Sequence, residues 1–131
     1  MGMTDESKTN AWSTALDLST IEDLADGDPA VQADLIGMFL RHTVEAIGKL
    51  RAAIDGDRFG EAAGIAHTAR GFSATLGIMT LVPTLRELEQ AARSPRPQER
   101  TGDLSRLLAQ WESEFDELRG TLTAWLDNAA G

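Results

Sequence analysis

Apolar residues recur along the chain at the spacing of amphipathic helices. Steps of three and four residues characterise a helix that buries one face, whereas strict alternation characterises a half-buried strand. The alternating pattern is absent, so the sequence predicts an all-α protein. Two stripes are long: one predicts a helix from residue 29 to about 54 and the other a final helix of about six turns. Their apolar positions are Ile36, Leu40, Thr43, Ile47, Leu50 and Ile54, then Leu104, Leu108, Trp111, Phe115, Leu118, Leu122 and Trp125.

Two shorter stripes lie between these helices. The third predicted helix begins near Phe59 and ends at Gly77, and a fourth follows it before the polar segment 93–100. Both have one apolar or small-residue face at helical spacing. Their inner positions are Phe59, Ala62, Ala66, Ala69, Ser73 and Leu76 in the third helix, and Leu81, Leu85, Leu88 and Ala92 in the fourth.

Capping signals set the predicted helix ends. Ser19 followed by Glu22 has the spacing of a capping box and predicts a short helix over 19–26, which Gly27 ends. Each remaining N-cap is an acidic or hydroxyl residue before an apolar stripe. These N-caps are Asp28, followed by Pro29 at the first helical position, Asp57, and Thr80, with Pro83 in the first turn.

Short connections between long helices favour antiparallel neighbours. We therefore predict an up-down-up-down antiparallel four-helix bundle over residues 17–128, with a short extra N-terminal helix. Residues 1–16 lack the apolar core of a signal peptide, and we expect them to form a flexible lead-in.

Composition narrows the choice of function. The 131 residues include no cysteine, which excludes disulfides, thiol catalysis and cysteine-based zinc sites. There are 12 basic and 21 acidic side chains, for a formal net charge of −9, which disfavours binding to nucleic acid or anionic lipid. No apolar run is long enough to span a membrane. We expect a cytoplasmic monomer whose partners are other proteins.

The face of the third helix opposite its core stripe has an unusual composition. An exposed helix face normally carries long polar side chains, but this one contains three glycines, each costing the helix about 0.5–1 kcal/mol relative to alanine. Either the face packs against another helix or a second copy of the chain, or its small residues leave its histidine, His67, accessible. The face comprises Gly60, Ala63, Gly64, His67, Arg70, Gly71 and Ala74.

Several kinds of histidine chemistry lack their partners. The H-E-x-x-H pattern is absent, so we expect no metal site. His42 lies on another predicted helix, where we interpret it as a surface histidine, or as lining a docking face with Met38. A hydrolase nucleophile elbow is also absent, and a bundle of this size offers no cleft for general acid–base catalysis. A nucleophilic imidazole that attacks a phosphoryl group remains, with Arg70 one turn away as the cation.

The segment "AHTARGFSATLG", residues 66–77, resembles the signature of histidine-containing phosphotransfer (HPt) domains. The resemblance implies that His67 is the phosphorylated residue and that Gly71 leaves clearance for a docking partner. It places Arg70, where the family most often has lysine, on the phosphoryl oxygens. The remaining site residues that it implies are Gly64, Ala63, Ala74 and Phe72 for docking, and Glu89 and Arg93 of the fourth helix near His67, with Glu89 orienting the imidazole.

The resemblance also implies a function. The protein would carry a phosphoryl group between aspartyl-phosphate receiver domains, including those of hybrid histidine kinases, in a two-component phosphorelay. It would not be an enzyme with its own nucleotide site and would need no cofactor, since Mg²⁺ would belong to the receiver. Two alternatives remain: an adaptor that docks a receiver or kinase without carrying phosphate, and an unrelated helical adaptor that dimerises through the glycine-containing face.

Overall fold

The computed structural model describes residues 18–130, which fold into helices joined by short turns. The all-α prediction is confirmed. The predicted lead-in, residues 1–16, lies outside the described residues. None of the helices in the described part combines the length and apolar character needed to cross a bilayer. The elements are α2 (Ser19–Leu24), α3 (Pro29–Asp55), α4 (Phe59–Thr75), the 3₁₀ turn η1 (Met79–Leu81), α5 (Val82–Ala92) and α6 (Pro97–Ala130).

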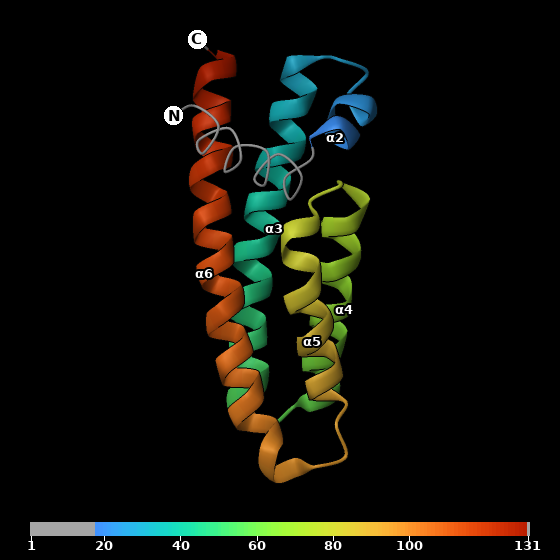
Figure 1. Ribbon diagram of the computed structural model, residues 1–131, viewed down its shortest axis with the longest axis vertical. Helices are drawn as coiled ribbons and strands as arrows, with labels where there is room; N and C mark the ends of the chain where they lie inside the picture. Colours follow the sequence, from blue (N-terminus) through green and yellow to red (C-terminus); the bar gives the residue numbers. More distant parts are fainter. Residues whose placement is uncertain (1–17, 131) are drawn as a thin grey trace, which may run out of the picture.

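The long helices pack side by side, each against two neighbours. Helix α3 packs against α4 and α6, and α5 packs against the same two helices. The chain direction alternates from one of these helices to the next, and the short α2 lies near the start of α3 (Figure 1). Helix α4 is therefore flanked by α3 on one side and by α5 on the other.

The predicted apolar stripes meet in one core. Leu50, Leu85 and Trp111 are fully buried and come from α3, α5 and α6. The buried side chains of α4 are small, so its backbone can approach both neighbouring helices closely. They are Ala62, Ala63, Ala66, Ala69 and Ser73.

Three positions of the predicted stripes are less buried than expected: Leu40, Phe59 and Trp125. Phe39, absent from the predicted stripe of α3, is completely buried, whereas the neighbouring Leu40 is half-buried. The Phe39 ring contacts Phe72 of α4 and Phe115 of α6, so the buried face of α3 is wider than a single stripe. Trp125, near the end of α6, is also only half-buried.

Three of the predicted N-caps lie at other residues in the structure. Leu18 occupies the N-cap of α2 with no side-chain hydrogen bond, so the capping box assigned to Ser19 is wrong. Asp57 is not the cap of α4: its φ of 54° belongs to the turn that ends α3, and Arg58 takes the cap position. Thr80 lies inside η1, and Leu81 precedes α5 in its place.

Asp28 caps α3 as predicted. Its Oδ1 accepts a hydrogen bond of 2.9 Å from the N–H of Ala30, and Pro29 occupies the first turn. We expect Asp28→Ala to lower the free energy of unfolding by about 1 kcal/mol, because the first turn loses an acceptor for one of its free N–H groups. Urea denaturation measures this. Asp28→Asn restores an acceptor and should keep most of the stability, and equal losses in both variants would contradict the capping role.

Candidate functional site

His67 lies in the middle of α4, in a part of the surface that is cleared of long side chains because its neighbours Gly64, Gly71 and Ala74 are small. Its side chain is 59% exposed. Gly64 and Gly71 lie one turn before and one turn after it, and a Cβ added to either glycine would meet nothing within 4 Å. Ala74, one turn further, is exposed as well. These positions of the predicted face point to solvent and leave open space around the imidazole.

Ala63 does not belong to this exposed face. It is 3% exposed and forms part of the core, so its predicted place on the accessible surface is wrong. Ala63 lies two turns before Arg70, on the edge of α4 that meets α5. Arg70 is itself half-buried because its guanidinium reaches α5. The sequence pattern predicted an exposed face wider than the one that α5 leaves uncovered.

A buried carboxylate of α5 connects the charged groups of the site. The side chain of Glu89 is 8% exposed, and its Oε2 lies 3.1 Å from His67 Nδ1. Glu89 Oε1 accepts a hydrogen bond of 2.9 Å from Arg70 Nη2. Arg93, one turn along α5, forms an ion pair of 2.8 Å with Oε2. The predicted neighbours Glu89 and Arg93 thus lie at the site, with Arg93 held there by Glu89.

The surrounding cations keep Glu89 ionised. Burial on its own would raise the pKa of this carboxyl, but the hydrogen bond from Arg70 and the charges of Arg93, His67 and Arg70 together outweigh burial and lower the pKa below its ordinary value. Glu89 is therefore a carboxylate at neutral pH, and it can only accept hydrogen bonds.

This carboxylate determines which nitrogen of His67 carries the proton. A bare Nδ1 would direct its lone pair at the oxygen of Glu89, 3.1 Å away, whereas a protonated Nδ1 donates to it. Arg70 Nη2, which can only donate, also lies near Nδ1 but at the longer distance of 3.3 Å, so the closer, charged carboxylate decides the tautomer. The neutral imidazole consequently has its proton on Nδ1 and its lone pair on Nε2. Nε2 makes no hydrogen bond to the side chains and backbone that the structure describes. The arrangement supplies an oriented, accessible nitrogen nucleophile.

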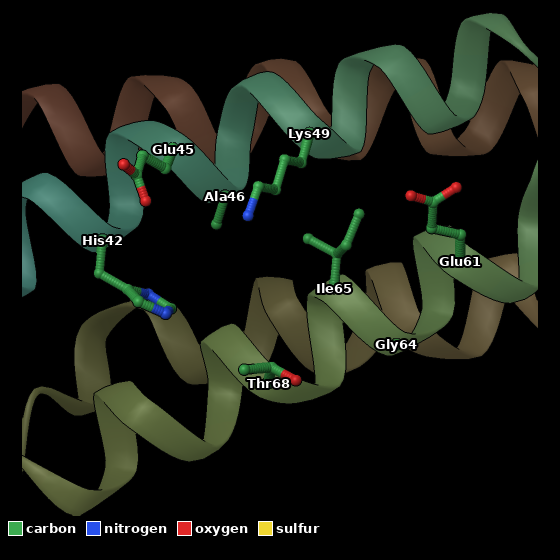
Figure 2. Close-up of a pocket in the computed structure, with 8 residues that line it drawn as sticks. All are labelled: His42, Glu45, Ala46, Lys49, Glu61, Gly64, Ile65 and Thr68. Atoms are coloured by element: carbon green, nitrogen blue, oxygen red, sulfur yellow. The ribbon is translucent and has the colours of Figure 1, made fainter.

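A groove of about 450 Å³ opens beside His67, between α3 and α4 (Figure 2). Figure 2 shows Ile65 and Lys49 pointing into the space between the two helices. Gly64 and Thr68 belong both to the groove and to the turn of α4 around His67. The α3 wall consists of His42, Glu45, Ala46 and Lys49, and the α4 wall of Glu61, Gly64, Ile65 and Thr68.

His42 is more enclosed than a surface histidine. Its Nδ1 is buried without a hydrogen-bond partner among the described residues, and its ring lies 4.6 Å from that of Phe72, centroid to centroid. Phe72 stacks in turn on Phe39 at 6.3 Å and packs against α3, while Met38 remains exposed. Sequence reasoning missed the groove. Its signal was the spacing of His42, Glu45 and Lys49 on one face of α3, but helical spacing alone does not show which helix borders that face.

Metal-binding geometry is absent from the described part of the chain. No group of three or more histidine, aspartate or glutamate side chains within it is placed to hold a metal ion. What the structure places at His67 is an exposed imidazole with two arginines and a carboxylate behind it.

The pH dependence of stability tests the role of Glu89. Since its pKa is lower in the folded protein, the carboxylate stabilises the fold above its ordinary pKa, and this contribution is lost as the pH falls from about 4.5 through the folded value. We expect Glu89→Gln to lower the free energy of unfolding at pH 7 by about 1–3 kcal/mol and to remove part of the acid dependence. Urea denaturation at several pH values measures both effects. Glu87→Gln, an exposed change on the same helix, should preserve the acid dependence, and identical pH profiles for all three proteins would contradict this assignment.

Comparison with known families identifies one match. The family model described as "Hpt domain" matches residues 34–125, which extend from α3 into α6 and include His67. No curated protein and no solved structure matches the chain.

Proposed function

The chain belongs to the Hpt domain family, and from that premise we propose that it carries a phosphoryl group on His67 between receiver domains of a two-component phosphorelay. Membership of the family connects the chain with histidine phosphotransfer. The observation that carries the specific assignment is the environment of His67: an exposed ring whose Nδ1 faces the Glu89 carboxylate and whose Nε2 is free within the described structure.

The chemistry of transfer follows from this tautomer. The Nε2 lone pair attacks the phosphorus of an aspartyl phosphate, an N–P bond forms, and the O–P bond breaks with its electron pair leaving on the aspartate carboxylate. No proton has to leave Nε2, because the ring proton is on Nδ1. The ring gains positive charge as the N–P bond forms, and Glu89, 3.1 Å from Nδ1, stabilises that charge.

Arg70 supplies the cation for the phosphoryl oxygens. It lies one turn after His67 on α4, and its Nη2 is 3.3 Å from His67 Nδ1. Arginine offers a planar set of N–H donors suited to phosphoryl oxygens, so it can replace the lysine that is usual in the family. Glu89 orients the imidazole, and Arg93 reaches the site through Glu89.

The receiver domain docks over the cleared part of α4. Gly64, Gly71 and Ala74 allow its backbone to approach His67, and the groove between α3 and α4 extends the contact surface (Figure 2). Phe72 supports this surface from below, where it packs against α3. The receiver contributes the aspartate and the Mg²⁺. We propose that the chain is a phosphocarrier without a nucleotide site of its own, and that it functions in the cytoplasm as a monomer.

Phosphotransfer from a labelled receiver domain tests the proposal. The purified chain is mixed with receiver domains carrying ³²P on their aspartate, and label should move to this protein. A phosphohistidine loses its label in acid and keeps it in base, whereas an aspartyl phosphate is lost in base. Binding to a receiver without any transfer would favour the adaptor alternative, and a dimer that buries His67 would favour the helical adaptor that associates through its glycine-containing face.

A further inference from the structure

Arg70 makes an incomplete set of hydrogen bonds with Glu89. Its Nη2 donates to Oε1 at 2.9 Å, but its Nε is buried and has no hydrogen-bond partner among the described residues. A guanidinium that engages a carboxylate through two parallel N–H groups is held more firmly than one that uses a single N–H. Arg70 is therefore attached to Glu89 by one hydrogen bond, and its Nε–H group remains available as a donor to another acceptor.

The guanidinium of Arg70 also lies beside Nδ1, the ring nitrogen of His67 that does not attack the phosphorus. Its Nη2 is 3.3 Å from Nδ1, the nitrogen that faces Glu89. A phosphoryl group would be bonded to Nε2, on the other side of the ring carbon between the two nitrogens. Nη2 is bonded to Glu89 and faces Nδ1, so Arg70 has to release Glu89 before this nitrogen can hold the oxygens of that group.

Glu89 keeps a second cation when Arg70 leaves. Arg93 Nη1 lies 2.8 Å from Oε2, the oxygen that Arg70 does not use. A buried carboxylate left without a counter-charge is strongly unfavourable. The side chain of Glu89 is buried, while that of Arg93 is 63% exposed and can remain in place without obstructing His67.

We infer that Arg93 is a positioning residue for phosphoryl transfer: it compensates the charge of Glu89 while Arg70 moves from Glu89 to the phosphoryl group on His67. The inference rests on the proposed function of His67. In the exchange, the Arg70–Glu89 hydrogen bond breaks, new bonds form between Arg70 and the phosphoryl oxygens, and no proton moves. Without Arg93, Arg70 stays on the carboxylate and is withheld from the phosphoryl group.

Unfolding of four proteins tests the exchange without any phosphotransfer. The wild type, Arg70→Gln, Arg93→Gln and the double variant are melted under the same conditions. Either arginine alone satisfies Glu89, so each single variant should be only slightly less stable than the wild type. The double variant should melt about 4 °C below the sum of the single effects, since it removes the last arginine from a buried carboxylate. Additive effects overturn the inference.

Transfer kinetics provide the second test. Arg93→Gln should accept phosphoryl from a labelled receiver about tenfold more slowly, equivalent to ~1.4 kcal/mol of activation free energy, and Arg93→Lys should restore most of the rate. In an Arg70→Gln background, Arg93→Gln should have no further effect. The defect should persist at alkaline pH, because the exchange moves no proton. The matched control is Arg86→Gln, which removes the same charge from an exposed position on α5.

The outcomes separate this inference from the proposed function. A wild-type chain that takes up no label from any receiver overturns the proposed function and, with it, this role of Arg93. If the wild type does take up label, the proposed function stands and three results would overturn the role of Arg93 alone. Arg93→Gln transfers at the wild-type rate, its defect vanishes at alkaline pH, or its defect adds to that of Arg70→Gln.

Discussion

Replacing His67 with glutamine should abolish uptake of label from a phosphorylated receiver domain, a loss of more than about 1000-fold. Glutamine approximates the size and polarity of the imidazole but has no nucleophilic nitrogen. The site would keep Glu89, Arg70 and the cleared surface around position 67, so the receiver should still dock. The measurement is the amount of ³²P on the chain after brief mixing, together with the affinity for the receiver by titration. Label on His67→Gln at the wild-type level would contradict the assignment of the acceptor.

His42 is the other histidine of the chain and provides the comparison. It lies in the groove wall, its Nδ1 is buried, and its ring packs against Phe72, so it is poorly placed to attack a receiver phosphate. His42→Gln retains His67 and should still become labelled. If label disappears from His42→Gln and persists on His67→Gln, the phosphoryl acceptor is His42 and not His67.

The surface around His67 was predictable because it depends on helical periodicity. A helix of small residues with apolar positions every three or four residues has one defined buried face, and Gly64, His67 and Gly71 lie opposite it. The extent of the exposed face was not predictable in the same way. Ala63 is buried because α5 covers the edge of α4, and how far a neighbouring helix covers an edge depends on the packing of the two helices.

The pairing of Glu89 with Arg70 and Arg93 behind His67 could be predicted only in part. Spacing alone places Glu89 and Arg93 on one side of α5, and the HPt resemblance put them near His67. It did not reveal that Arg70 binds Glu89 rather than standing free beside Nε2. Such pairing depends on side-chain conformation at the α4–α5 contact. The wrongly predicted caps have a related cause. Asp57 was expected to cap α4, but it forms part of the turn that ends α3.

Replacing Gly71 with glutamine should block phosphotransfer while leaving the fold intact. A Cβ at this position meets nothing within 4 Å, so the new side chain projects into solvent above α4. Glutamine favours a helix more than glycine does, and the free energy of unfolding should rise by about 0.5 kcal/mol or more. The same side chain would occupy the space that a receiver backbone needs next to His67. We expect transfer to fall about 100-fold, or ~2.7 kcal/mol in activation free energy.

Gly120→Gln is the matched control for this change. Gly120 is also an exposed helical glycine with nothing within 4 Å of an added Cβ, but it lies on α6, which borders α3 and α5 rather than α4. Both variants should gain stability in urea denaturation, and only Gly71→Gln should lose transfer. If Gly71→Gln transferred phosphoryl at the wild-type rate, the smallness of residue 71 would not serve access to His67. An equal loss in both variants would instead indicate a general effect of lengthening the side chain on a helix surface. The comparison therefore separates clearance at the acceptor from any effect on the fold.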